Sequence, residues 1–175
     1  MKENPTYHSL GDHTETIQVD YDPTVISYGR LLDVFWDSHD PVRPSWSRQY
    51  MSAIFYQNDE QKRQTLLSMA RVKQRQKKVY TKILPLTEFY HAEAYHQKHR
   101  LRSDRDLMRD FNTMYPQQED FMNSTAAARI NGYLYGYGSL EDLKNELPGF
   151  GLSTVAESKL VEVVKKRKGK IACAP

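Results

Sequence analysis

The segment over residues 87–97 places aromatic and imidazole rings beside two carboxylates on what its pattern predicts to be a short helix. At a period of 3.6 residues, an apolar stripe through Phe89 borders a polar stripe through Tyr90 and Glu93. Such a helix can carry proton-transferring and hydrogen-bonding groups at the rim of a pocket. The same composition is also typical of rings that fill a core while backbone carbonyls satisfy the histidines. Both interpretations stay open.

A metal site is a second chemistry to consider for this segment. Its histidines and glutamates are His91, His96, Glu88 and Glu93, and their spacing matches no zinc-binding pattern. The sequence therefore predicts no metal site.

Length and composition bound the class of protein. A chain of 175 residues, 39% of them hydrophobic, suffices for one ordinary domain with a smaller appendage. No apolar run approaches the roughly 20 residues that a membrane-spanning helix needs. The single cysteine, Cys173, excludes an internal disulfide and is compatible with a reducing compartment. We therefore expect a soluble protein without membrane association, in the cytoplasm, with a mitochondrial or other compartment left open.

The basic residues gather in two places although the net charge is only +3. Residues 62–82 carry only basic charges, and residues 165–170 are nearly all lysine and arginine. Such patches can attract nucleic acid, but they are more often the solvated side of a helix. Because no nucleic-acid-binding motif accompanies them, we do not favour a nucleic-acid partner.

The elements that must position these groups begin with strands and helices in alternation. Polar and apolar residues alternate over 14–21, which predicts a strand there. Strand-like composition predicts two more strands, at 49–56 and 81–86. Ser27 is a predicted N-cap for one helix. Asn58, with Gln61 three residues on, predicts the start of a longer helix to about Gln76. Apolar residues of that longer helix, including Leu66 and Leu67, are expected to pack against the sheet.

Beyond Arg100 the pattern is helical only. Helices are predicted over residues 104–114 and 121–131 and after Ser139 and Ser153, with a flexible aromatic loop over residues 132–138. Ser139 with Asp142 predicts a capping box. We therefore expect an α+β fold in which a mixed β-sheet is flanked by helices and followed by a helical extension. The expected division is residues 1–100 for the α+β domain and 101–175 for the helical extension with its basic tail.

Several separate motifs in residues 4–100 also follow one family in order. They include Asn-Pro-Thr-Tyr at residues 4–7, Gly-Asp-His-Thr-Glu at 11–15, Tyr-Asp-Pro at 21–23, His-Asp-Pro at 39–41, Gln-Tyr-Met-Ser-Ala-Ile at 49–54, Ile-Leu-Pro at 83–85 and the 89–97 run. Together they resemble the type A peptide methionine sulfoxide reductases. The resemblance implies an enzyme that reduces the S epimer of methionine sulfoxide, in proteins or free, with thioredoxin as external reductant and no bound cofactor.

The chemistry of that reaction explains the residue types. A thiolate attacks the sulfoxide sulfur, a proton donor serves the oxygen, and an apolar cage holds the methyl group. By resemblance, Glu15 is the acid, and partial burial beside aromatic rings would keep its carboxyl group neutral. Tyr50 matches a tyrosine that hydrogen-bonds the sulfoxide oxygen. An exposed glutamate at the start of a strand and an ordinary strand tyrosine are the alternatives.

The sequence departs from the family at the substrate-positioning aspartate. Ser45 occupies that position, which weakens substrate positioning. Trp46 can supply apolar contact for the methyl group, although covering the core is the alternative role for a loop tryptophan.

A larger departure concerns the nucleophile. The family's Gly-Cys-Phe-Trp segment precedes the Asn-Pro-Thr-Tyr motif by several tens of residues, and no such segment is in these 175 residues. A partial gene product or isoform, which the start at Met1 favours, and a loss of the chemistry are the two explanations. We expect little or no turnover from this chain alone. The alternatives are a non-catalytic binding module and, third, a nucleic-acid adaptor.

Cys173 is the remaining thiol and follows the basic run at residues 165–170. Nearby cations favour a thiolate, but a tail offers no oriented acid or methyl pocket. By position it resembles a resolving cysteine, which forms a disulfide with the oxidised nucleophile. An inert tail thiol is the alternative.

Overall fold

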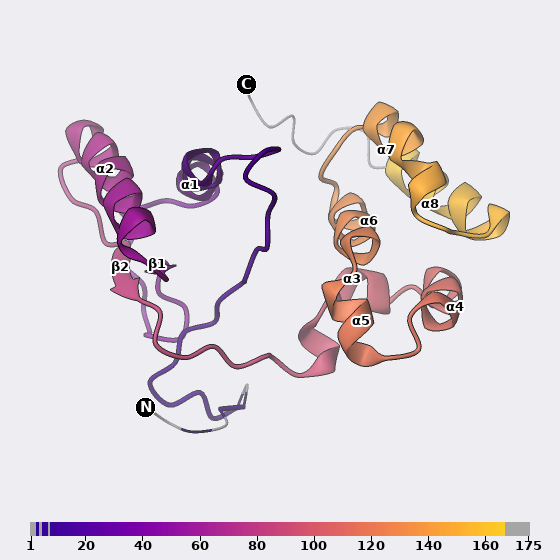
Figure 1. Ribbon diagram of the computed structural model, residues 1–175, viewed down its shortest axis with the longest axis horizontal. Helices are drawn as coiled ribbons and strands as arrows, with labels where there is room; N and C mark the ends of the chain where they lie inside the picture. Colours follow the sequence, from indigo (N-terminus) through magenta and orange to yellow (C-terminus); the bar gives the residue numbers. More distant parts are fainter. Residues whose placement is uncertain (1–2, 4, 7, 167–175) are drawn as a thin grey trace. The chain divides into compact units, whose positions relative to one another are not determined.

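The computed structural model describes residues 3, 5–6 and 8–166, and its contacts divide the chain into two compact units (Figure 1). The first unit ends at His91 and the second begins at Ala92. Two parallel strands and eight α-helices are found in the described residues, with the last six helices consecutive. The expected α+β class with C-terminal helices is therefore confirmed. Cys173 lies outside the described residues.

The first unit is built on a strand, helix, strand sequence. Strands β1 (Ala53–Tyr56) and β2 (Lys82–Pro85) pair in parallel, with Ile54 opposite Ile83. A parallel pair requires a crossover, and α2 (Asp59–Arg75) provides it. Helix α1 (Tyr28–Asp37) precedes β1 and shares a small apolar core with it and with one face of α2.

Side-chain caps explain where α1 and α2 begin. The Ser27 hydroxyl accepts a hydrogen bond from the Arg30 backbone N–H at 3.2 Å. The Asn58 side chain likewise accepts from the Gln61 backbone N–H at 2.9 Å, while the Gln61 side chain accepts from the Gln57 N–H at 2.8 Å. These bonds satisfy backbone donors that the helix itself leaves unpaired. Both predicted helix starts are confirmed.

Polar contacts run through the interior of the first unit. The buried Trp36 donates its indole N–H to the Ser68 hydroxyl at 3.0 Å, and Tyr28 shares a 3.0 Å hydrogen bond with Thr65. The face of α2 that is buried therefore carries Thr65 and Ser68. Leu66 and Leu67 are exposed, so the prediction that they pack against the sheet is wrong. The helix is oriented so that its two buried hydroxyl groups hydrogen-bond the aromatic side chains of α1.

Two predicted elements of the first unit are not formed as expected. Residues 14–21 form no strand, and Ile17 is 85% exposed. An alternating pattern needs a neighbouring strand to pair with, and none of the described residues supplies one here. The sequence 87–97 is not a helix except for the single 3₁₀ turn η1 (Ala94–His96), and the backbone of Glu93 is extended. Rings of this segment pack locally instead, His91 against Phe89 at 5.5 Å between centroids.

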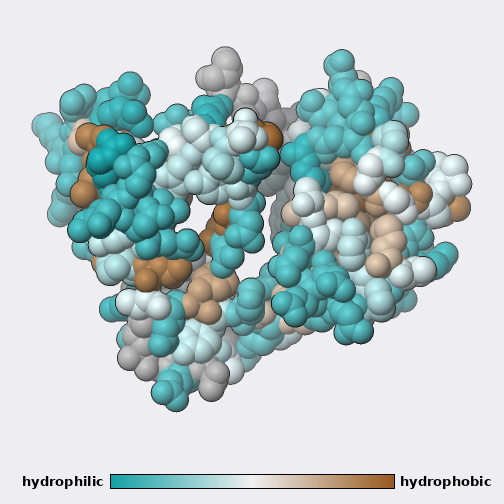
Figure 2. All heavy atoms as spheres, in the orientation of Figure 1, coloured by the Kyte–Doolittle hydropathy of each residue, from teal (hydrophilic) through white to brown (hydrophobic). Residues whose placement is uncertain are grey.

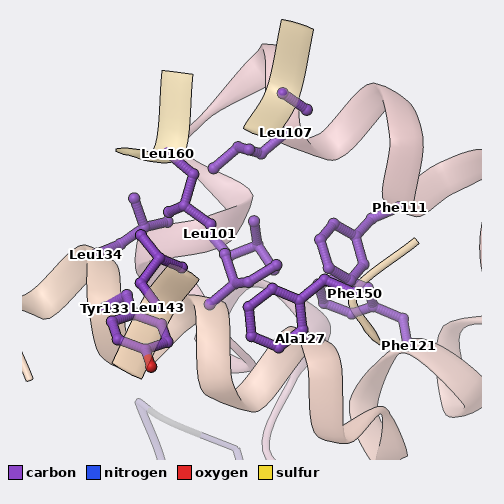
Figure 3. Close-up of a cluster of buried hydrophobic side chains, with 12 residues drawn as sticks. Leu101, Leu107, Phe111, Phe121, Ala127, Tyr133, Leu134, Leu143, Phe150 and Leu160 are labelled. Atoms are coloured by element: carbon purple, nitrogen blue, oxygen red, sulfur yellow. The ribbon is translucent and has the colours of Figure 1, made fainter. Parts of the chain in front are cut away.

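The second unit is helical throughout. After η1 its helices are α3 (His99–Arg102), α4 (Arg105–Met114), α5 (Gln118–Asn123), α6 (Thr125–Tyr135), α7 (Leu140–Glu146) and α8 (Thr154–Lys166), with the 3₁₀ turn η2 (Leu147–Gly149) after α7. Twelve buried hydrophobic residues form one core among them, enough for this unit to have an interior of its own (Figure 3). Phe111, Phe121 and Phe150 gather on one side of that core.

The helix boundaries of the second unit differ from the predicted ones at two places. The helix predicted over 121–131 is divided at Ser124, whose side chain caps α6 by accepting from the Ala127 N–H at 3.1 Å. The loop predicted over 132–138 is wrong up to Tyr135, because α6 continues to that residue and ends at Gly136, with φ of 97°. The capping box of Ser139 and Asp142 at the start of α7 is confirmed.

Hydrophilic residues cover most of the visible surface over α2 (Figure 2). This agrees with the run of basic side chains along that helix. Across the described part of the chain, every helix is too short or too polar to cross a lipid bilayer.

Candidate functional site

A chain of hydrogen bonds joins Glu15 to Tyr50 through Gln49. The Gln49 side-chain amide donates to the Glu15 carboxylate at 2.8 Å and lies 3.1 Å from the Tyr50 phenol oxygen, to which it also donates. The backbone supports the same pairing, since the Glu15 N–H donates to the Gln49 carbonyl at 2.9 Å. The acid and the phenol proposed by sequence are therefore brought together, although 34 positions separate Glu15 from Gln49.

The loop before β1 holds this arrangement in place. Thr14 donates its hydroxyl to the Arg48 carbonyl at 3.1 Å, next to the Glu15 contact. The Met51 N–H donates to the same carbonyl at 3.3 Å, which closes a turn around Gln49 and Tyr50. The turn leads directly into β1, so the site is anchored to the sheet although residues 14–21 are not part of it.

Ser45 and Trp46 lie at the other end of the same loop. The Ser45 hydroxyl donates to the Ser47 carbonyl at 2.6 Å, and it accepts from the Ser47 N–H at 3.3 Å. This local turn replaces a carboxylate that the family would have there. The Trp46 ring lies 5.0 Å from the Tyr50 ring and is 82% exposed. Trp46 therefore does not cover the core, and its ring is accessible beside the phenol.

Glu15 is exposed in this structure, so the expected burial beside aromatic rings is not found. The reason is that residues 14–21 do not enter the sheet. One ring of the aromatic segment, that of Tyr90, packs edge-on against His13 at 5.3 Å between centroids. Tyr90 also donates to the Glu88 carboxylate at 2.9 Å. The 87–97 segment thus contributes a ring two residues from Glu15, without forming a helix.

Gln49 is the site residue that sequence reasoning missed. It was visible beside Tyr50 in the Gln-Tyr pair, but its two contacts depend on how the loop turns. The signal that could have found it is the amide group itself, because it can donate to a carboxylate in one motif and to a hydroxyl in another.

The geometry of the site is suited to polarising an oxygen atom. Within the described ranges, no group of three histidine, cysteine or acidic side chains is placed to bind a metal ion. A carboxylic acid, an amide N–H and a phenol that converge can instead hydrogen-bond a polarised oxygen atom of a ligand.

Comparisons with known proteins give the arrangement a context. A family model for peptide methionine sulfoxide reductase matches residues 1–129. A second model, for the helical domain of selenoprotein methionine sulfoxide reductase A, matches residues 117–166. The family match is therefore longer than the resemblance noted over residues 4–100 and extends through the helical unit to residue 166.

Individual relatives agree with both models. A peptide methionine sulfoxide reductase of Drosophila melanogaster is 38% identical over 172 residues, which cover 94% of this chain and 67% of the relative. Peptide methionine sulfoxide reductase A5 of Arabidopsis thaliana is 40% identical over 75% of this chain and 54% of the relative. Peptide methionine sulfoxide reductase MsrA of Methanothermobacter thermautotrophicus is 40% identical over 59% of this chain and 68% of the relative. The chain thus spans from about half to about two thirds of the length of these relatives.

Proposed function

Because the chain belongs to the peptide methionine sulfoxide reductase family, we propose that it binds methionine S-sulfoxide and takes part in its reduction to methionine. The substrate is proposed to be oxidised methionine in proteins or the free amino acid. The observation that carries the proposal is the hydrogen-bonded set of Glu15, Gln49 and Tyr50, in two segments that carry family motifs.

Each residue has a distinct part in the proposed site. Glu15 supplies the proton to the sulfoxide oxygen, and Tyr50 hydrogen-bonds the same oxygen. Gln49 positions both, since its amide contacts the carboxylate and the phenol. Ser45 and Trp46 contact the substrate beside them, and the exposed Trp46 ring offers an apolar surface to the methyl group.

The electrons come from sulfur. A thiolate attacks the sulfoxide sulfur, the oxygen passes to the thiol as a sulfenic acid, and methionine is released. A second thiol then condenses with the sulfenic acid to a disulfide and water, and the dithiol of thioredoxin reduces the disulfide. The 175 residues hold one thiol, Cys173, which we propose as the resolving partner of a nucleophile outside these residues. The cytoplasm is the proposed compartment, since thioredoxin keeps thiols reduced there.

Binding of the two sulfoxide epimers tests the site without requiring turnover. Calorimetric titration of the full chain with blocked peptides should show tighter binding of methionine S-sulfoxide than of the R epimer or of methionine. Gln49→Ala should weaken S-sulfoxide binding by about twofold to tenfold, the size of one lost hydrogen bond. Glu119→Gln, an exposed carboxylate in α5, is the matched control and should leave it unchanged. Equal affinity for all three peptides would contradict the proposal.

Turnover separates an enzyme from a binding module. With dithiothreitol as reductant, we expect the 175-residue chain to reduce the S-sulfoxide far below the rate of a complete family member, because residues 8–166 contain no cysteine. Specific binding without reduction supports the non-catalytic module for this polypeptide alone. Ordinary enzymatic rates that disappear in Cys173→Ser would instead identify Cys173 as the nucleophile and overturn its assignment as the resolving thiol.

A further inference from the structure

A pocket of about 410 Å³ lies beside the loop that carries Gln49 and Tyr50. Its lining combines three cationic side chains with hydroxyl groups; they are Arg43, Arg48, Lys82, Ser45, Ser52 and Tyr80. None of the described residues that line it is acidic. The arginine and lysine side chains only donate hydrogen bonds, and the hydroxyl groups can rotate to donate as well. This composition suits an anion.

The cations of this pocket lack the partners that surface cations usually have. In the part of the chain that the structure describes, no ion pair or hydrogen bond engages the side-chain nitrogens of Arg43, Arg48 or Lys82. A second pocket of about 230 Å³, between α1 and α2, shows the contrast. Its Arg63 pairs with Glu60 at 2.6 Å and its Arg71 lies 3.6 Å from Asp33. Only the first pocket therefore offers positive charge that no neighbouring carboxylate neutralises.

Backbone hydrogen bonds fix the segments from which these cations project. The Lys82 N–H donates to the Ser52 carbonyl at 2.9 Å, which aligns the start of β2 with the residue before β1. The Tyr80 N–H donates to the Pro41 carbonyl at 2.8 Å and ties this segment to the one that carries Arg43. The backbone around the pocket is thus fixed before any ligand arrives, so binding has mainly side chains to order.

The pocket and the proposed sulfoxide site share one loop. Ser45 lines the pocket, Arg48 lines it too, and Gln49 and Tyr50 follow directly. The Arg48 carbonyl is also the acceptor that holds Thr14, the neighbour of Glu15. A ligand that places a sulfoxide oxygen near Gln49 can therefore place a nearby anionic group near Arg48.

We propose that this pocket binds a carboxylate of the sulfoxide substrate. This proposal rests on the proposed function above. Two sources supply the same chemistry. One is an aspartate or glutamate next to the oxidised methionine in a protein, and the other is the α-carboxylate of free methionine sulfoxide. The pocket thereby selects acidic sequences around the oxidised residue.

Matched peptides test the pocket. The full chain is titrated calorimetrically, in 0.15 M salt, with blocked pentapeptides in which methionine S-sulfoxide has either two glutamates or two glutamines as neighbours. The acidic peptide should bind more tightly. The double variant Arg48→Gln, Lys82→Gln should reduce the acidic-to-neutral affinity ratio by about threefold to tenfold, as expected for two partly exposed ion pairs.

A charge-matched variant separates the pocket from the general field of the protein. Lys73→Gln with Arg75→Gln removes two exposed cations from the last turn of α2, which does not line the pocket. Because neither side chain lines the pocket and salt screens charges that make no direct contact, this variant should change the ratio less than the pocket variant does. An equal loss of selectivity in both double variants would overturn the pocket.

Two further arms identify the source and keep the two proposals apart. Free methionine S-sulfoxide and its methyl ester differ only at the α-carboxylate, so a pocket-dependent preference for the acid assigns that group, whereas a preference confined to peptides assigns the side chains. If neutral sulfoxide peptides bind, and neither neighbouring glutamates nor a free α-carboxylate strengthens binding, the proposal for the pocket is wrong while that for the sulfoxide site stands. If glutamates strengthen binding of methionine and sulfoxide peptides alike, the pocket binds carboxylates while the sulfoxide site is wrong.

Discussion

The two units of the chain bury their side chains in different ways. Among the described residues, twelve buried hydrophobic residues form the core of the helical unit, whereas the core of the first unit has three, Leu32, Trp36 and Ile54. The first unit adds polar contacts to its interior, such as the bonds of Trp36 to Ser68 and of His39 to Thr81. The comparison teaches that apolar packing holds the helical unit, while specific hydrogen bonds carry more of the first unit, where the proposed site lies.

The largest effect is expected in the helical core. Phe111 is fully buried and meets Phe121 edge-on at 5.8 Å between ring centroids. Phe111→Ala should lower the free energy of unfolding by about 3–5 kcal/mol, since a cavity remains where the ring was. Denaturant unfolding followed by circular dichroism measures it. Val155→Ala, at a side chain 70% exposed, should stay within about 0.5 kcal/mol. Similar losses of unfolding free energy in both variants would contradict the conclusion that apolar packing holds the helical unit.

The next effect concerns the polar interior of the first unit. Ser68→Ala leaves the Trp36 indole N–H buried without its acceptor, which should cost about 1–3 kcal/mol. A double-mutant cycle with Trp36→Phe isolates this bond, because each single variant removes it. The double variant should therefore cost less than the two single variants summed. Strict additivity in the unfolding free energies would show that the bond contributes nothing.

Helix caps should affect both units alike. Ser27→Ala in the first unit and Ser139→Ala in the second each remove a hydroxyl that accepts from a backbone N–H. Each should cost about 1 kcal/mol, with Ser139→Ala the larger because Asp142 also loses the hydroxyl that donates to it. Unfolding free energies of the two variants provide the test. A cost confined to one unit would show that the local bonds differ as much as the cores do.

The smallest effect is a change in pH dependence within the helical unit. Lys159 lies 2.8 Å from Asp104 and 2.6 Å from Asp106. The hydrogen bond from Lys159 lowers the pKa of Asp106, and the same contacts raise the pKa of Lys159. A carboxyl with a lowered pKa binds its proton less tightly in the folded state, so this stabilisation is present above its usual pKa near 4 and is lost as pH falls through the folded value.

Lys159→Met should therefore flatten the acid side of the stability profile. Urea unfolding at pH 7 and at about pH 2.5 compares the two proteins, and the difference between the two pH values should shrink in the variant. On the alkaline side, the raised pKa of Lys159 means that its contribution is present below its ordinary pKa and fades as pH rises through the folded value. Unchanged profiles at both ends would show that solvent screens these exposed pairs completely.

Local signals in the sequence predicted helix starts well. Ser27, Asn58 and Ser139 act within three residues of themselves, so their capping bonds depend on little else. Elements that need a distant partner were predicted poorly. Residues 14–21 alternate as a strand does, but no strand lies beside them in the described chain. The ends of α5 and α6 depend on Ser124 and Gly136, which the periodic pattern alone passes over.

The candidate site shows the same limit. Motifs that resemble a known family singled out Glu15 and Tyr50, yet no spacing in the sequence shows that Gln49 contacts both. The carboxylate pocket was beyond prediction for a similar reason. Its cations come from positions 43, 48 and 82, and the pairing of β1 with β2, together with the bond from Tyr80 to Pro41, brings these segments to one place.

The parallel pair of β1 and β2 also has a consequence for handling the protein. Each strand has one flank that faces no other strand within the described residues, so backbone donors and acceptors there can recruit a strand from another molecule. Self-association by this route grows with concentration. Purification and calorimetry are therefore best done in dilute samples, with the apparent molecular mass followed across a dilution series before any affinity is interpreted.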